Sequence, residues 1–189
     1  MLQLLGIISG ILSGGSYLPY IRDIFKGTTK PERASWFIWA TLGVIAFFSQ
    51  LAEGASWSLW FTALDTLGVF LIFTLSFKYG VGGFNRRDVF ALMAAGVGLI
   101  LWYLTRHAFI ALFITMFIDA TGAVLTVLKA YEDPGSETLS MWVIIAFAAI
   151  LAMASVGTFN PVLLAYPFYI FLANAAVVIA ILFGRVKKI

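Results

Sequence analysis

The sequence predicts an all-helical protein that crosses a membrane several times. Of its 189 residues, 62% are apolar and only 11% are charged, whereas a soluble domain is near half apolar and about a quarter charged. The apolar residues also fall into long runs, and crossing about 30 Å of hydrocarbon as a helix takes roughly 20 such residues. The chain has no cysteine, which excludes disulfide bonds and thiolate metal sites.

Seven apolar runs are long enough, or nearly so, to be transmembrane helices. We expect these helices at residues 2–24, 35–53, 57–78, 88–105, 108–129, 140–157 and 161–184. The first run lacks a positively charged start, so we interpret it as a retained helix and not as a signal peptide. The connections at 54–56 and 106–107 are very short, so the helices that they join must be antiparallel neighbours.

The charges of the loops predict the direction in which the helices cross the membrane, because Lys and Arg collect in cytoplasmic loops. With the N-terminus outside, the inner junctions hold eleven of the twelve basic residues, and Arg106 alone lies outside. The eleven are Arg22, Lys26, Lys30, Arg33, Lys78, Arg86, Arg87, Lys129, Arg185, Lys187 and Lys188. The sequence therefore predicts an N-outside, C-inside protein.

The six tryptophans lie near the expected helix ends. Three are near inner ends and three near outer ends: Trp36, Trp39 and Trp142, and then Trp57, Trp60 and Trp102. Amphipathic rings are enriched at the headgroup level of a membrane. We therefore interpret the tryptophans as interfacial belt residues, with a stacking site for a flat ligand as the alternative for the Trp36/Trp39 pair.

The chain contains a weak internal repeat. When the first three expected helices are laid over the last three with a shift near 106 residues, Trp36 meets Trp142 and Ala40 meets Ala146. Loop lengths, charge placement and helix order recur as well, while the fourth helix has no counterpart. Because three is odd, this spare helix returns the chain and makes the two repeats parallel. The expected parts are a first triple-helix bundle, a linker helix with its loops, and a second triple-helix bundle: residues 1–80, 81–106 and 107–189.

This arrangement, with a proline near the inner end of the first helix and a basic loop after it, resembles the SWEET and PQ-loop (MtN3-like) superfamily of membrane transporters. The Pro-Gln signature of that superfamily is Pro19-Tyr20 here, and its second copy aligns with Leu125-Thr126. The resemblance implies transport by alternating access, with a polar residue from the third and the seventh helix meeting the cargo at mid-membrane. The chain looks like a prokaryotic branch, which implies a bacterial or archaeal inner (plasma) membrane.

Two acidic residues lie within the expected spans, namely Asp65 and Asp119. An ionised carboxylate inside a bilayer costs at least about 2.5–3.5 kcal/mol, so such groups normally face the interior of a helix bundle. Counted from the outer helix ends, these two residues and Asn174 lie within about 8 Å of each other in depth, around the midplane. We expect a substrate-binding site there; the alternative is a polar clamp that holds neighbouring helices together.

Other residues have expected roles in the same picture. The resemblance implies that Asp65 and Asn174 face each other across the substrate site, with Asp119 close by. The hydroxyl groups of Tyr166 and Tyr169 are further candidates for the substrate path, with a role in the upper core or the interfacial belt as the alternative. The ring of Trp39 is another candidate. Pro19 is a candidate gate hinge or a helix end, and Pro167 is a candidate hinge that bends the outer half of its helix. Small residues at a spacing of four let helices approach closely, so we expect helix packing at Gly6, Gly10 and Gly14.

The remaining ionisable residues disfavour other functions. His107 is the only histidine, so no paired-histidine zinc motif exists. No lysine lies mid-span where a retinal Schiff base would need one. An aspartyl dyad of Asp65 and Asp119 lacks a recognisable flanking motif, which disfavours an intramembrane enzyme. We expect no cofactor, no metal and no nucleic-acid partner.

We therefore expect a transporter that moves a small polar solute by alternating access. A carboxyl group in its site can couple a proton to the solute or pair with a cationic solute. A receptor or binding protein of the same fold that transports nothing is the alternative. Sugars, amino acids and vitamin-like solutes all remain open, as does assembly into a homo-oligomer. The surrounding lipid is the remaining partner.

Overall fold

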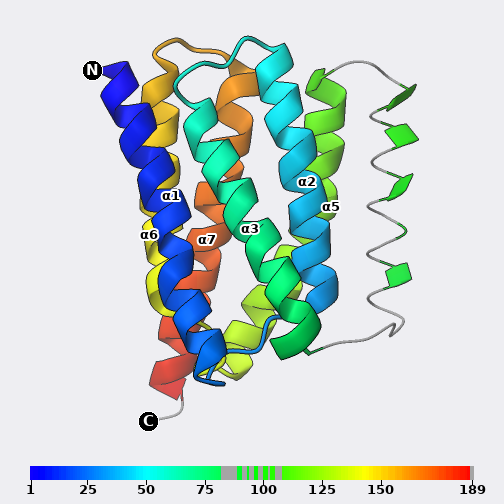
Figure 1. The fold of residues 1–189 in the computed structure, drawn as a ribbon, viewed down its shortest axis with the longest axis vertical. Helices are drawn as coiled ribbons and strands as arrows, with labels where there is room; N and C mark the ends of the chain where they lie inside the picture. Colours follow the sequence, from blue (N-terminus) through cyan, green and yellow to red (C-terminus); the bar gives the residue numbers. More distant parts are fainter. Residues whose placement is uncertain are drawn as a thin grey trace.

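The computed structural model describes residues 1–81, 89–90, 93, 96–97, 100–101, 103–104 and 108–187 of the chain. It has six long helices and no extended strand within these residues, so the all-helical prediction is confirmed there (Figure 1). The helices are α1 Leu2–Phe25, α2 Arg33–Ala52, α3 Leu59–Tyr79, α5 Ala108–Glu132, α6 Leu139–Val156 and α7 Pro161–Lys187. The helix expected at 88–105, within the expected linker 81–106, lies largely outside the described residues.

Five of these helices, α1, α2, α3, α6 and α7, are long and apolar enough to cross a membrane by length and composition. Large apolar side chains also remain exposed on the outside of the helices, for example Leu18 at 68%, Phe117 at 75% and Phe183 at 65%. An exposed apolar surface that is spread over several helices is unusual for a soluble monomer. These features are those of an integral membrane protein, and we treat the chain as one.

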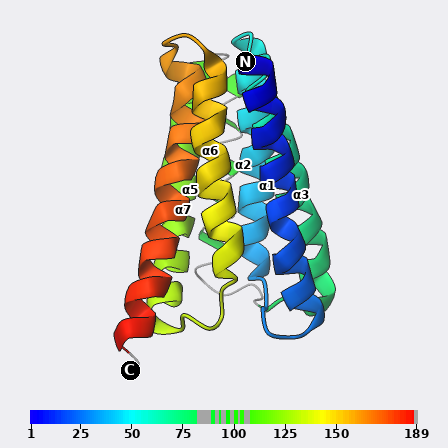
Figure 2. The ribbon, with the colours of Figure 1, turned by 90° about the vertical axis from the view of Figure 1, so that its left-hand side faces the viewer.

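The six helices form a closed ring. α1 packs against α3 and α6, α2 packs against α3 and α5, and α7 packs against α5 and α6 (Figures 1 and 2). The order around the ring is therefore α1, α3, α2, α5, α7, α6. The chain runs downward in Figure 1 through α1, α3, α5 and α7 and upward through α2 and α6, and its two ends lie at opposite ends of the ring.

The pairing of helices is unchanged when α1, α2 and α3 are exchanged for α5, α6 and α7. The α1–α3 contact becomes the α5–α7 contact, and the α2–α3 contact becomes the α6–α7 contact. The two remaining large contacts, α1–α6 and α2–α5, exchange with each other. Among the described helices, the two sets of three thus have the same internal order of neighbours.

Helix α1 approaches α3 closely through two of its glycines. A Cβ atom added to Gly6 would lie 2.3 Å from the Trp57 carbonyl oxygen, and one added to Gly10 would lie 2.9 Å from that of Trp60. At Gly14 the nearest atom would be Leu64 Cβ at 3.4 Å, which is close to an ordinary contact. Only Gly6 and Gly10 therefore leave no room for a side chain against the backbone around the start of α3.

The helix ends are fixed by side chains in both triplets, but not by equivalent ones. The Glu32 carboxylate accepts hydrogen bonds from the amides of Ala34 (3.3 Å) and Ser35 (2.7 Å) and so caps α2. Asn160 caps α7 in the same way ahead of Pro161. Glu137, which a one-residue slip in the loop of the repeat pairs with Glu32, makes no such cap and instead forms an ion pair with Lys129.

Both candidate hinge prolines lie inside helices. α1 continues past Pro19 to Phe25, and α7 contains Pro167 well after its first residue. The interpretation of Pro19 as a helix end is therefore wrong, and Pro167 lies inside its helix as expected. Each proline removes one backbone donor, which leaves the carbonyl groups of Gly15 and Leu163 without their usual intrahelical bonds.

Candidate functional site

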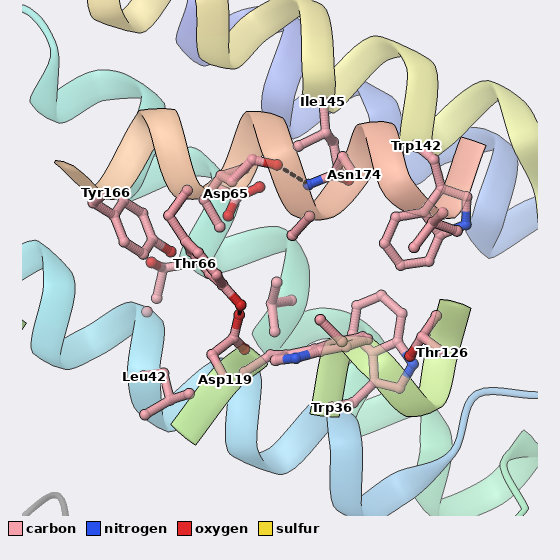
Figure 3. Close-up of a pocket in the computed structure, with 18 of the residues that line it drawn as sticks. Trp36, Leu42, Asp65, Thr66, Asp119, Thr126, Trp142, Ile145, Tyr166 and Asn174 are labelled. Carbon is pink, nitrogen blue, oxygen red and sulfur yellow. Dashed lines mark hydrogen bonds between the residues drawn. The ribbon is translucent and has the colours of Figure 1, made fainter. Parts of the chain in front are cut away.

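A cavity of about 70 Å³ lies in the middle of the ring (Figure 3). All six described helices contribute residues to its wall: Tyr17 from α1, Leu42 from α2, Asp65 from α3, Asp119 from α5, Ile145 from α6 and Asn174 from α7 are examples. A volume of this size is well above the roughly 10–15 Å³ that a single water needs. The cavity is thus shared by the two triplets and belongs to neither alone.

Asp65 is buried on α3 and is held by two donors from α1. Its Oδ1 atom accepts hydrogen bonds from Ser13 Oγ at 2.9 Å and from the Tyr17 hydroxyl at 2.8 Å. Ser13 and Tyr17 are four residues apart, so both lie on the same face of α1. Among the described residues Oδ2 has no hydrogen-bond partner, which leaves one carboxyl oxygen free in the cavity wall.

Asp119 is buried on α5 and has a comparable arrangement. Its Oδ2 atom accepts a hydrogen bond from the hydroxyl group of Tyr169 on α7. Within the described part of the chain, its Oδ1 atom has no partner. Each carboxyl group is therefore bonded to a helix of its own triplet, α3 to α1 in the first and α5 to α7 in the second.

Asn174 on α7 presents an unsatisfied acceptor. Its Nδ2 atom donates to the carbonyl oxygen of Ile170 at 2.7 Å, and only the amide nitrogen can lie so close to a carbonyl oxygen. The free atom is therefore Oδ1, which is buried without a partner. The Thr66 hydroxyl, also in the wall, is likewise buried and unpaired. Unpaired buried polar groups are costly, so a ligand or water is expected to complete them.

One end of the cavity is aromatic. The rings of Trp36 and Trp39 lie 5.2 Å apart between centroids, and those of Trp39 and Trp142 lie 6.3 Å apart. In Figure 3, Trp36 and Trp142 lie at the opposite end of the group from Tyr166, with Asp65 and Asp119 between them. The pocket therefore has an indole-lined end next to its carboxyl groups.

The belt interpretation is wrong for Trp36 and Trp142. Trp36 is 3% exposed and Trp142 is 7% exposed, because the ring of helices turns both side chains inward. Trp57 and Trp60, at 38% and 48% exposed, have the exposure that a belt residue needs. Trp102 lies outside the described residues.

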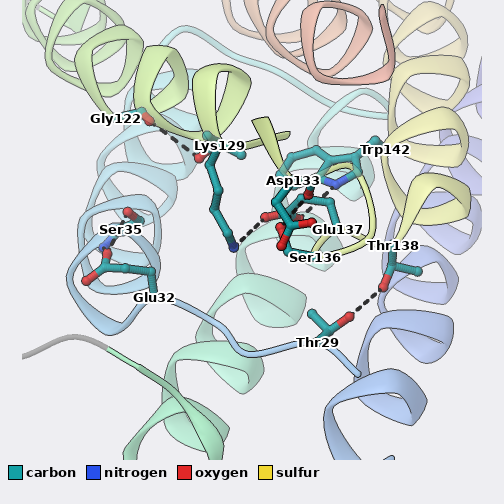
Figure 4. A network of polar contacts seen from close by, with 11 residues as sticks. Thr29, Glu32, Ser35, Gly122, Lys129, Asp133, Ser136, Glu137, Thr138 and Trp142 are labelled. Carbon is teal, nitrogen blue, oxygen red and sulfur yellow. Dashed lines mark hydrogen bonds and ion pairs between the residues drawn. The ribbon is translucent and has the colours of Figure 1, made fainter. Parts of the chain in front are cut away.

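Beyond the aromatic end, polar side chains join the loops that follow α1 and α5 (Figure 4). Thr138 Oγ1 donates to Asp23 Oδ2 at 2.9 Å and lies 3.2 Å from Thr29 Oγ1. Since the single hydroxyl hydrogen of Thr138 is used on Asp23, the Thr29 hydroxyl is the donor of the second bond. We call these three residues, Asp23, Thr29 and Thr138, the latch, because they bond one triplet to the other.

Glu137 lies next to the latch and connects it to the cavity wall. It accepts hydrogen bonds from Lys129 Nζ at 3.1 Å and from Trp142 Nε1 at 3.2 Å. Burial raises the pKa of the Glu137 carboxyl group above its ordinary value, and the Lys129 ammonium group opposes this rise. The Trp142 ring in the cavity is thus fixed from outside by a buried acid.

The charged residue types in the described wall are acidic only. Among the described lining residues there is no Lys, Arg or His, while there are two Asp. In the same part of the chain, no group of three or more His, Cys, Asp or Glu is placed to hold a metal ion. The site therefore offers carboxyl and amide acceptors, the hydroxyl group of Thr66 and aromatic faces.

The structure brings all six expected substrate-binding residues to this one cavity: Asp65, Asp119, Asn174, Tyr166, Tyr169 and Trp39. It leaves the prolines and the three packing glycines out of the wall. Sequence reasoning missed Ser13 and Tyr17, although their spacing of four on the first helix was visible, and it missed the free hydroxyl group of Thr66. No protein-family model, no curated protein and no solved structure matches this chain, so its function must be argued from the cavity itself.

Proposed function

We propose that this protein is a membrane transporter that moves a small polar solute by alternating access through the central cavity. The proposal includes seven transmembrane helices in a 3+1+3 order, with the fourth helix between the two triplets, the N-terminus outside and the C-terminus inside. It also includes the resemblance to the SWEET and PQ-loop superfamily, and a bacterial or archaeal plasma membrane as the location. The common packing order of the two triplets supports the parallel repeat.

The observation that carries the proposal is a cavity at the seam between the triplets, with buried polar groups that lack partners. Asp65 and Asp119 each keep a free oxygen, and Asn174 keeps a free Oδ1. Polar groups at mid-membrane depth are costly and usually mark a substrate or ion path. A solute that bonds to them would offset that cost.

The bonding pattern also favours movement of one triplet against the other. The carboxyl groups bond within their own triplets, so they do not act as clamps across the seam. Among the described residues, the side-chain hydrogen bonds that cross the seam lie in the latch, at one end of the ring. Opening that end would require the loss of these bonds and leave the internal bonds of both triplets intact, which is what alternating access needs.

The experiment is solute uptake into proteoliposomes with an imposed pH gradient. A thermal-shift screen of the purified protein would select the solutes, because a ligand that binds only the folded state stabilises it. We expect Asp65→Asn to reduce uptake and to flatten its dependence on external pH, since the variant can no longer exchange a proton at this position. The matched control is Glu53→Gln, an exposed acid at the far end of α2, which should leave uptake unchanged.

Unchanged uptake and an unchanged pH response in Asp65→Asn would remove Asp65 from the mechanism. Solutes that stabilise the protein but never cross the vesicle membrane would contradict transport as a whole. That result would instead favour a receptor or binding protein built on the same helices.

A further inference from the structure

We infer that the solute bound in the cavity is a small organic cation that carries N–H donors, such as an alkylammonium or guanidinium group. This inference rests on the proposed function and deepens it by naming the class of solute. Three independent features of the wall lead to it: the direction of the free hydrogen bonds, the sign of the charge and the tryptophan rings.

Three of the free polar atoms in the wall are acceptors, beside the unpaired hydroxyl group of Thr66. Asn174 is 5% exposed and lines the cavity, and its Oδ1 is buried without a partner. The second oxygens of Asp65 and Asp119 also have no partner among the described residues. The hydroxyl donors of Tyr17 and Tyr169 are already used on these carboxyl groups. A ligand that supplies N–H donors can hydrogen-bond to these oxygens. A carboxylate or phosphate ligand has only acceptors and cannot.

The charges exclude anions and disfavour zwitterions. Two carboxyl groups line the cavity, and no cationic side chain lines it in the part of the chain that the structure describes. An amino acid could pair its ammonium group there, but its carboxylate would have no positive partner in a site of low dielectric constant. A simple ammonium or guanidinium ion has no such unpaired group.

The tryptophans suit the remaining surface of such a cation. Trp36, Trp39 and Trp142 line the cavity beside the carboxyl groups, with neighbouring ring centroids 5.2 and 6.3 Å apart (Figure 3). A cation within about 6 Å of an indole face is attracted by the ring quadrupole. The volume of about 70 Å³ is well above the roughly 10–15 Å³ that one water needs, so methylammonium or guanidinium has room in it.

The test is equilibrium binding to the purified full chain in lipid nanodiscs, measured by titration calorimetry. The probes are methylammonium, guanidinium, tetramethylammonium, glucose and glycine. We expect methylammonium and guanidinium to bind and to compete with each other. Tetramethylammonium should bind more weakly, because it has no N–H donor for the three free oxygens. Glucose and glycine should bind least.

Variants then assign the binding to this wall. Asp119→Asn removes a charged acceptor, and Asn174→Ala removes the free amide oxygen; each should weaken methylammonium binding by about tenfold or more, as expected for hydrogen bonds to a charged group. Glu53→Gln is the matched control and should leave the affinity unchanged. Thermal unfolding of each variant without ligand establishes that it is folded, and if one variant does not fold, the other gives the result.

Glucose or glycine binding as tightly as the cations would overturn the inference, as would wild-type affinity for methylammonium in the folded variants. The proteoliposome assay separates this outcome from the fate of the proposed function. Cation binding without flux would support the cation site and contradict transport. Flux of a neutral solute without cation binding would support transport and contradict the cation site.

Discussion

At the scale of single residues, the Asp65 site depends on a glycine that touches no ligand. A Cβ atom added to Gly68 would lie 2.1 Å from Cδ2 of Tyr17. The missing side chain therefore lets the Tyr17 ring lie against α3, where its hydroxyl group reaches Asp65. In the sequence Gly68 is one of 17 glycines, and nothing in its neighbours along the chain sets it apart from the others.

Gly68→Ala should therefore destabilise the protein. The new methyl group would force the Tyr17 ring to move, and such overpacking costs about 1–3 kcal/mol. The displaced hydroxyl group would also leave Asp65 with Ser13 as its one remaining donor. The midpoint of thermal unfolding in detergent micelles, followed by tryptophan fluorescence, measures the loss of stability.

The control for this substitution is Gly15→Ala on α1. Gly15 is exposed, and no atom lies within 4 Å of the position of its added Cβ atom. An alanine there should be neutral or stabilise the helix by up to about 1 kcal/mol. Equal unfolding midpoints for the two variants would show that Tyr17 does not need the space at Gly68.

At the scale of elements, hydropathy predicted the described helices well but not what they face. Apolar runs place the expected spans at 2–24 and 140–157, close to the observed α1 Leu2–Phe25 and α6 Leu139–Val156. A run of apolar residues does not state which side meets lipid and which meets the other helices. Trp36 was therefore interpreted as a belt residue, although its ring is buried beside Tyr20, with 5.2 Å between the centroids.

The candidate site was predictable in part, because only some of its residue types are unusual in a membrane helix. Acidic residues are so costly in a bilayer that Asp65 and Asp119 stood out from a sequence that is 62% apolar. Serine, threonine and tyrosine carry no such penalty, because their hydroxyl groups can hydrogen-bond to the backbone of their own helix or to a lipid headgroup. The roles of Ser13, Tyr17 and Thr66 thus depend on helix packing, which the sequence does not state.

Helix α1 keeps its proline within a continuous helix, and this makes Pro19 a testable hinge. Pro19→Ala restores a backbone donor to the Gly15 carbonyl group and should stabilise α1 by up to about 3 kcal/mol. We expect a higher unfolding midpoint and slower solute flux, with little change in ligand affinity, because Pro19 does not line the cavity. Proteoliposome flux and calorimetric binding measure the two effects separately.

The control for the hinge is Leu18→Ala, at a neighbouring position that is 68% exposed. This change alters the outer surface of α1 without supplying a backbone donor, so flux should stay at the wild-type level. Wild-type flux in Pro19→Ala together with a raised unfolding midpoint would assign Pro19 a structural role without a part in gating.

At the scale of the whole molecule, the two triplets have the same packing order but are unequal in detail. The carboxyl group lies on α3 in one triplet and on α5 in the other, and the capping acid Glu32 has its counterpart Glu137 in an ion pair with Lys129. The Glu137 carboxyl group also accepts a bond from Trp142, a residue of the cavity wall. A change at the latch end can thus reach the cavity through a single buried side chain.

This geometry makes the latch the place to test whether the two triplets move apart. The Oγ atoms of Thr29 and Thr138 are 3.2 Å apart, and a disulfide needs an S–S distance of about 2.0 Å, so Thr29→Cys with Thr138→Cys should cross-link under mild oxidation. The chain contains no other cysteine, which makes loss of maleimide labelling a direct measure of the bond.

We expect the oxidised double variant to lose solute flux, because the cross-link holds the latch end closed, and dithiothreitol to restore it. The oxidised protein should still bind its solute, since the cavity wall is unchanged, and oxidised Thr29→Cys alone should transport normally. Full flux in the cross-linked protein would mean that the latch end does not open during transport, and the cavity would then have to be loaded and emptied by another path.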